Sequence, residues 1–142
     1  MIKIRKYKEE DNKQVKRLVT EVIMELYHQK PKHIQDLNNI KKNYISYIVA
    51  ENNKKIIGIV SLQKKDNKTA KLRRLYINKK FRRKGLGQKL LKEIESIAKK
   101  LKFKYIVLNT KHKNEIALNL YQKNNYKDYK KIKSRVYLKK DI

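Results

Sequence analysis

The sequence contains no cysteine, one proline and three glycines among its 142 residues. Without cysteine the chain has no disulfide bond, no thiolate nucleophile and no cysteine-ligated metal. Its longest apolar runs, such as Ile56 to Val60, fall far short of the roughly 18 residues that a membrane-spanning helix needs. Residues 1–5 alternate in polarity, unlike the start of a signal peptide. We therefore expect a single globular domain over residues 1–142, located in the cytoplasm and without a membrane partner.

Acidic residues are also scarce, since 13 Asp and Glu stand against 40 Lys and Arg, which gives a net charge of +27. This charge favours anionic partners over cationic ones. Lysine supplies 33 of the basic residues, a bias that nucleotide composition alone can produce, so the lysine total does not by itself indicate a binding function. Arginine is more informative, because it forms forked contacts with phosphate and four of the seven arginines are clustered: Arg73, Arg74, Arg82 and Arg83.

The pattern of apolar residues predicts an alternation of strands and helices. Polarity alternates over 2–6, as in a strand, and apolar residues recur at helical spacing over 9–27. Further along we expect a short helix near 33–42, strands at 44–50, 55–63, 69–77 and 105–108, helices at 86–101 and 114–124, and strands at 127–132 and 135–139. The strand, helix and strand between residues 69 and 109 form a βαβ unit, whose two strands should be parallel. The fold class is therefore α/β or α+β, with a mixed sheet between helices on both faces.

The strand predicted at 69–77 changes its apolar phase partway along. Ala70 and Leu72 set one alternation, and Leu75 and Ile77 continue it one residue late. A single inserted residue has this effect, so we expect a β-bulge near Arg73 and Arg74. Bulges often lie beside active sites, where they redirect a side chain.

Two of the three glycines, Gly85 and Gly87, fall in the basic segment Arg82-Arg83-Lys84-Gly85-Leu86-Gly87, just before the clearest helix. Glycine there lets consecutive backbone N–H groups approach an anion at the positive end of the helix dipole. The spacing fits neither a Walker-type phosphate loop nor the dinucleotide-binding fingerprint. The alternative interpretation is a basic turn that leads into a helix.

This loop and a second motif together resemble the GNAT N-acetyltransferase superfamily. The first motif is Arg82-x-x-Gly85-x-Gly87 after a strand that ends Leu75-Tyr76-Ile77, and the second is Asn114-x-x-Ala117-x-x-x-Tyr121-Gln122-Lys123-Asn124-Asn125-Tyr126. The resemblance covers the order of elements over nearly the whole chain. It implies a mixed, mostly antiparallel sheet of about seven strands, with the cofactor loop in the one parallel βαβ unit. It also implies acetyl-CoA-dependent transfer of an acetyl group to a primary amine by direct attack, the amine being a protein N-terminus, a lysine or a small molecule.

The resemblance also implies roles for individual residues. The loop and the residue after it would bind the pyrophosphate of acetyl-CoA, the backbone of the preceding strand would pair with the pantetheine arm, and Asn114 would cap a helix and contact the cofactor. Tyr121 would donate a proton to the departing thiolate, because a phenol with a pKa of about 10 is protonated at neutral pH. No metal is expected. The cofactor-binding set is Leu75, Tyr76, Ile77, Arg82, Arg83, Lys84, Gly85, Leu86, Gly87, Gln88 and Asn114.

The sequence does not identify the general base or the acceptor. Strand positions where relatives often have a carboxylate hold Lys71 and Asn109, which leaves His112, Glu21 and Glu25 as open candidates. The positive charge of the chain disfavours a polycationic acceptor and favours a neutral or acidic amine, or a protein N-terminus.

Two other functions and two oligomeric states also stay open. One alternative is an acetyltransferase associated with nucleic acid, acting on aminoacyl-tRNA or a ribosomal protein and docking through its basic surface. The other is a basic RNA-binding module without catalysis. The protein would be a monomer or a homodimer.

Overall fold

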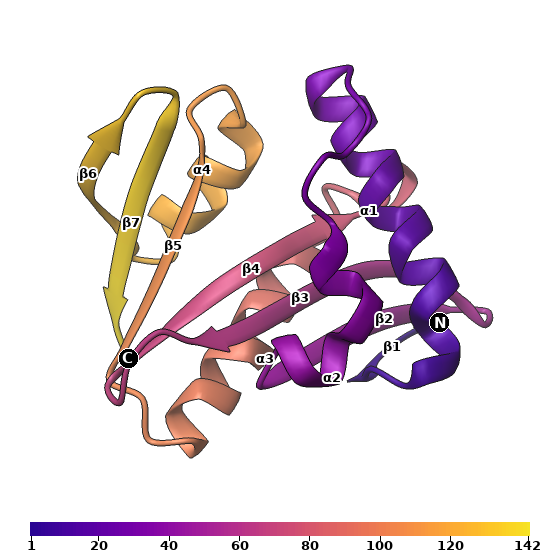
Figure 1. Cartoon of the computed structure of the whole chain (residues 1–142), viewed down its shortest axis with the longest axis horizontal. Helices are drawn as coiled ribbons and strands as arrows, with labels where there is room; N and C mark the ends of the chain where they lie inside the picture. The colour runs from indigo at the N-terminus through magenta and orange to yellow at the C-terminus, as the bar shows by residue number, and fades with distance from the viewer.

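A seven-stranded sheet with strand order β1-β2-β3-β4-β5-β7-β6 runs through the protein, seen in a computed structural model that describes residues 1–142 (Figure 1). The strands are β1 (Ile2–Lys6), β2 (Ser46–Asn52), β3 (Lys55–Lys64), β4 (Thr69–Ile77), β5 (Tyr105–Lys111), β6 (Lys127–Ile132) and β7 (Arg135–Asp141). Only the β4–β5 pair is parallel. The predicted fold class, a mixed and mostly antiparallel sheet, is confirmed.

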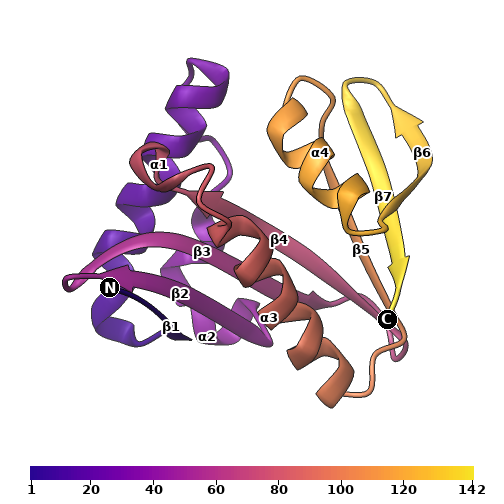
Figure 2. The same ribbon diagram turned by 180° about the vertical axis from the view of Figure 1, so that it is seen from behind.

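The helices lie on both faces of this sheet (Figures 1 and 2). The α-helices are α1 (Asn12–Tyr27), α2 (Ile40–Asn43), α3 (Leu86–Lys100) and α4 (Glu115–Lys123), and the short 3-10 turns are η1 (Glu9–Asp11), η2 (Gln35–Asn39) and η3 (Lys79–Phe81). The helix predicted at 9–27 thus begins with a separate 3-10 turn, and the one near 33–42 is mostly a 3-10 turn. None of these helices is both long enough and apolar enough to cross a lipid bilayer.

The core consists of two hydrophobic clusters, one on each face of the sheet. Residues of α1 and α2 pack with Tyr47 and Val49, whereas residues of α3 and α4 pack with Ile48 and Ala50. These four neighbours lie on β2, where successive side chains point to opposite faces. The central strands are therefore covered on both sides, which holds the edge of β4 in a fixed place.

The parallel strands β4 and β5 are paired over a short length only. Thr69–Lys71 pairs with Tyr105–Val107, and beyond this point the two strands diverge (Figure 1). Each strand keeps its other neighbour, since β4 remains paired with β3 and β5 with β7. The outcome is a V-shaped opening in the middle of the sheet, bounded by Leu72–Ile77 on one side and Leu108–Lys111 on the other.

The predicted bulge in β4 is confirmed and lies at this opening. Ser61 and Ile59 of β3, two positions apart, pair with Arg73 and Tyr76, three positions apart. The extra residue is accommodated by Arg74, whose φ of 57° is left-handed. A bulge of this kind redirects the side chains around it.

Arg74 is directed by the bulge toward the α1 face, where it forms a forked ion pair. Its Nε donates to Asp36 Oδ2 at 2.9 Å and its Nη2 to Asp36 Oδ1 at 2.7 Å, while the Tyr44 hydroxyl donates to the same carboxylate. Arg74 Nη2 also donates to the carbonyl of His33 at 2.8 Å. With Arg74 only 8% exposed, this pair fixes the segment before α2 against the open part of β4.

We expect Asp36→Asn to destabilise the protein by about 3–5 kcal/mol at neutral pH, because it leaves the buried Arg74 guanidinium without its negative partner. Burial raises the pKa of Asp36, but hydrogen bonds from Arg74 and Tyr44 outweigh burial and lower it overall. The stability that this carboxylate contributes is therefore present above its unfolded-state pKa of about 4 and is lost as the pH falls below that value.

Urea unfolding across a pH series checks this prediction. The difference in unfolding free energy between wild type and Asp36→Asn should close as the pH falls from about 5 to about 2. Asp141→Asn is the control, since Asp141 is exposed and forms no salt bridge, and it should change the unfolding free energy by less than about 0.5 kcal/mol. A gap of constant size at every pH would contradict the role of the Asp36 charge.

Candidate active site

The glycine loop leads directly into α3. Gly85 is the N-cap residue with a left-handed φ of 81°, and no side chain caps the helix. The first backbone N–H groups of α3 therefore lack both an intrahelical acceptor and a side-chain acceptor. Arg83, Lys84 and Gly85 are exposed beside them. The arrangement leaves donors and positive charge available to an anion at the positive end of the helix dipole.

Two side chains that the sequence assigned to the cofactor are already engaged within the protein. Arg82 Nη2 lies 2.7 Å from Glu25 Oε1, and Arg82 Nε donates to the carbonyl of Ile77 at 3.0 Å. Gln88 exchanges hydrogen bonds with the amide of Asn124, one of them 2.7 Å long. These side chains hold the loop to α1 and α3 to the end of α4. The available groups of the loop are its backbone N–H groups and the side chains of the next two basic residues.

Gly87 lies in a closely packed place between other elements. A Cβ atom at this position would lie 3.2 Å from Leu120 Cδ2 and 3.3 Å from Ile77 Cδ1. Glycine is therefore needed so that α3 can pack closely against α4 and β4. A side chain here would press on these two apolar residues, an effect that adds to the one predicted on a bound anion.

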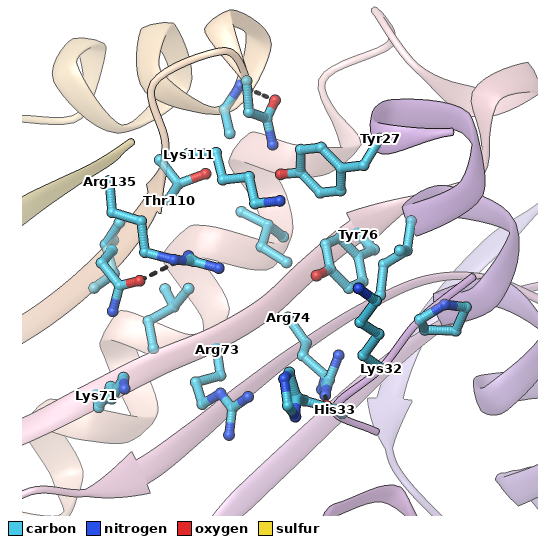
Figure 3. A pocket seen from close by; sticks show the side chains of 18 of the residues that line it. Tyr27, Lys32, His33, Lys71, Arg73, Arg74, Tyr76, Thr110, Lys111 and Arg135 are labelled. Atoms are coloured by element: carbon cyan, nitrogen blue, oxygen red, sulfur yellow. Dashed lines mark hydrogen bonds between the residues drawn. The ribbon is translucent and has the colours of Figure 1, made fainter. Parts of the chain in front are cut away.

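Two adjoining cavities lie beyond the loop. A small apolar cavity of about 80 Å³ is lined by Arg82 of the loop and mainly by apolar residues of α1, β4 and α4. A larger cavity of about 340 Å³ occupies the opening between β4 and β5 and extends to the segment after α1 (Figure 3). Both are lined by the same five residues, Leu75, Tyr76, Asn114, Ala117 and Tyr121. The small apolar cavity thus adjoins the larger one and is bordered by the loop at Arg82.

Tyr121 lies where the two cavities meet. Its side chain is 5% exposed, and its ring packs edge-on against Tyr126 at a centroid distance of 5.6 Å. The hydroxyl has no hydrogen-bond partner within the protein, yet it is not among the fully enclosed polar atoms, so it faces the cavities. Burial raises the pKa of Tyr121, and nearby Tyr76 and Tyr27 raise it further. The phenol is therefore protonated at neutral pH and can donate a proton.

Asn114 caps α4, as expected, and its predicted contact with the cofactor stays a prediction. Its Oδ1 accepts a hydrogen bond from the backbone N–H of Ala117 at 3.3 Å, which caps α4. The residue also lines both cavities. Leu75, Tyr76 and Ile77 lie on the part of β4 that diverges from β5, with the Ile77 carbonyl already bonded to Arg82.

The residues considered as the general base, Glu21, Glu25 and His112, do not line the larger cavity. Glu25 is bound to Arg82, and Glu21 is exposed on α1. His112 is exposed, with its Nδ1 3.2 Å from the carbonyl of Ser134, and it does not line the larger cavity. Asn109 accepts a hydrogen bond from Arg135 at 2.9 Å. No Asp or Glu lines this cavity, so a carboxylate base is absent from its walls.

Several lining residues were not singled out from the sequence. Tyr27, the segment 29–33 and Arg135 reach the larger cavity from three separate parts of the chain (Figure 3). Lys111, in the same wall, lies over the ring of Tyr27 at 4.1 Å from its centroid. No local pattern marks these residues, because only the tertiary fold brings them to the same opening.

The sequence is similar to that of known acetyltransferases. The sequence profile of the acetyltransferase (GNAT) family matches residues 12–126, which include both motifs. Probable N-acetyltransferase 14 of Xenopus tropicalis is 38% identical over 73 residues, a match that spans 51% of this chain and 35% of that protein. The chain thus corresponds to about a third of the length of this relative.

Solved structures share the whole fold. An acetyltransferase of the GNAT family from Staphylococcus aureus Mu50 gives a TM-score of 0.91 at 22% identity, with 99% of both chains covered. PaiA N-acetyltransferase from Thermoplasma acidophilum, solved in complex with coenzyme A, gives 0.86 at 22% identity and covers 100% of this chain and 99% of its own. With the fold shared from end to end and the family profile matched over residues 12–126, the chain belongs to the acetyltransferase (GNAT) family, as its two motifs predicted.

Proposed function

We propose that this GNAT-family protein works as a single catalytic domain that uses acetyl-CoA to acetylate a primary amine by direct attack. The observation that carries the proposal is the position of Tyr121 at the junction of the two cavities. One cavity leads from the anion-binding loop and suits the apolar pantetheine arm, and the other is open to an acceptor. The coenzyme A complex of the T. acidophilum relative supports the choice of donor.

In this proposal the donor is held mainly by backbone. The N–H groups at the start of α3, with Arg83 and Lys84, bind the diphosphate. The unpaired edge of β4 at Leu75 and Tyr76 pairs with the amide groups of pantetheine, as an added strand would. Arg82 and Gln88 act as positioning residues, through Glu25 and Asn124.

The transfer step needs one proton donor and one proton acceptor. The neutral amine nitrogen attacks the thioester carbonyl carbon, and the carbon–sulfur bond breaks as the tetrahedral intermediate collapses. The Tyr121 hydroxyl gives its proton to the departing thiolate. The proton lost by nitrogen passes to water in the open cavity, and water reprotonates the phenolate. No covalent enzyme intermediate is involved, in keeping with a chain that lacks cysteine.

Stabilisation of the protein by acetyl-CoA tests the role of the donor loop. Acetyl-CoA at about 100 times its Kd should stabilise the wild-type protein by about 2.7 kcal/mol and raise its Tm. Gly87→Val should largely remove this shift, because the new side chain pushes Leu120 and Ile77 into the small apolar cavity. Thermal melting with and without acetyl-CoA measures the effect.

The control for this experiment is Ser96→Val, which adds the same side chain at an exposed position of α3. It should keep the full shift, so that a loss seen only at Gly87 is not a general effect of valine in the helix. A wild-type protein that gains no stability from acetyl-CoA would contradict the proposed function and favour the module without catalysis.

Removal of the Tyr121 hydroxyl tests the role of this residue as proton donor. Tyr121→Phe should lower kcat by about 10²–10⁴-fold, because the thiolate then departs without general acid assistance. The Kd for acetyl-CoA, measured by calorimetry, should stay close to that of wild type, since the ring and its packing against Tyr126 remain. Tyr129→Phe, at a position 49% exposed, is the matched control and should leave kcat unchanged. Equal kcat in wild type and Tyr121→Phe would remove Tyr121 as the acid.

A further inference from the structure

The larger cavity carries charge of one sign only. Seven of its lining residues are lysines or arginines, and none is Asp or Glu. Carboxylates on nearby elements are committed elsewhere, Asp36 to Arg74 and Glu25 to Arg82. A cationic acceptor would therefore find no negative group on these walls.

Six of these seven cations, all except Arg74, form no salt bridge. Lys71 and Arg73 on β4 form no side-chain hydrogen bond or salt bridge, although both are partly buried. Arg135, at the start of β7, extends from the far side of the opening toward β4 (Figure 3). Its Nη1 donates to the neutral amide of Asn109 at 2.9 Å, which orients the guanidinium without balancing its charge.

These cations are close enough to act on one another. Burial lowers the pKa of Lys71, and repulsion from Arg73, Lys65 and Arg135 lowers it further. The two arginines line the V from its two walls and neither guanidinium is held by a carboxylate, so both can offer N–H donors to an anionic group in the cavity. An anion bound there would relieve the repulsion and supply the missing counter-charge.

We propose that the acceptor is a small amine that also carries an anionic oxygen group, carboxylate or phosphate, and that Lys71, Arg73 and Arg135 bind this group. The inference rests on the proposed function, since it places the amine of the same molecule toward Tyr121. A cavity of about 340 Å³ has the size of a small-molecule site. Arg74 is excluded from the set because Asp36 neutralises it.

Paired acceptors test the proposal. Initial rates are measured for β-alanine against β-alaninamide and for phosphoethanolamine against ethanolamine, with acetyl-CoA saturating. The anionic member of at least one pair should have a kcat/KM about tenfold or more above its neutral partner. A higher kcat/KM for β-alanine than for β-alaninamide indicates a carboxylate site. A higher kcat/KM for phosphoethanolamine than for ethanolamine indicates a phosphate site. Equal kcat/KM within both pairs would overturn the proposal.

Variants locate the preference in the cavity. Arg73→Gln and Arg135→Gln should reduce the preference about tenfold while leaving the melting shift with acetyl-CoA intact. Arg17→Gln, which removes an exposed arginine from α1, should retain the preference. A preference that survives both cavity variants would also overturn the proposal.

A binding measurement keeps the test independent of turnover. Calorimetric titration of β-alanine and phosphoethanolamine into the protein with coenzyme A present should show binding that weakens about tenfold in Arg73→Gln and not in Arg17→Gln. Absence of binding for both ligands overturns the acceptor proposal even where acetyl-CoA stabilises the protein. Absence of stabilisation by acetyl-CoA instead counts against the proposed function.

Discussion

The short pairing of β4 with β5 creates the opening in the sheet that contains the candidate active site. These strands meet only through Thr69–Lys71 and Tyr105–Val107, and their remaining lengths stay bonded to β3 and β7. The backbone of β4 therefore presents an unpaired edge inside the protein, where an edge is normally covered or paired. Both cavities, the cap of α4 and the approach to Tyr121 follow from this divergence.

Arginine has two separate tasks at this opening. Arg74 and Arg82 each form a forked pair with a carboxylate, and the two pairs tie β4 and its loop to η2 and α1. Arg73 and Arg135 have no carboxylate partner and face the larger cavity. The bulge places Arg73 and Arg74 one after the other between Leu72 and Leu75, which both pack on the α3 face, and the left-handed backbone at Arg74 lets that side chain reach Asp36. Neighbouring residues of one type thus differ in their contacts, since Arg74 is held in an ion pair and Arg73 is available to the acceptor that we propose.

The sequence predicted the elements and the bulge well, because each leaves a local mark. The one-residue shift from Leu72 to Leu75 is such a mark, and so is a glycine directly before a helical stripe. The hydrogen bonds of Arg82 and Gln88 have no local mark in the sequence, because their partners Glu25 and Asn124 are distant along the chain. The same holds for Gly87, whose close neighbours are fixed by packing between α3, α4 and β4. Contacts between remote segments depend on the tertiary fold, which periodicity does not encode.

The carboxylate-free wall has one more chemical effect, on the nucleophile itself. An ammonium group is about a thousandfold more abundant than the free amine at neutral pH for an ordinary aliphatic pKa of about 10. Inside a cavity whose charged lining is wholly basic, like charge disfavours the ammonium and lowers its pKa. The field of the walls therefore favours deprotonation, which supports the proposal that water accepts the proton of the amine.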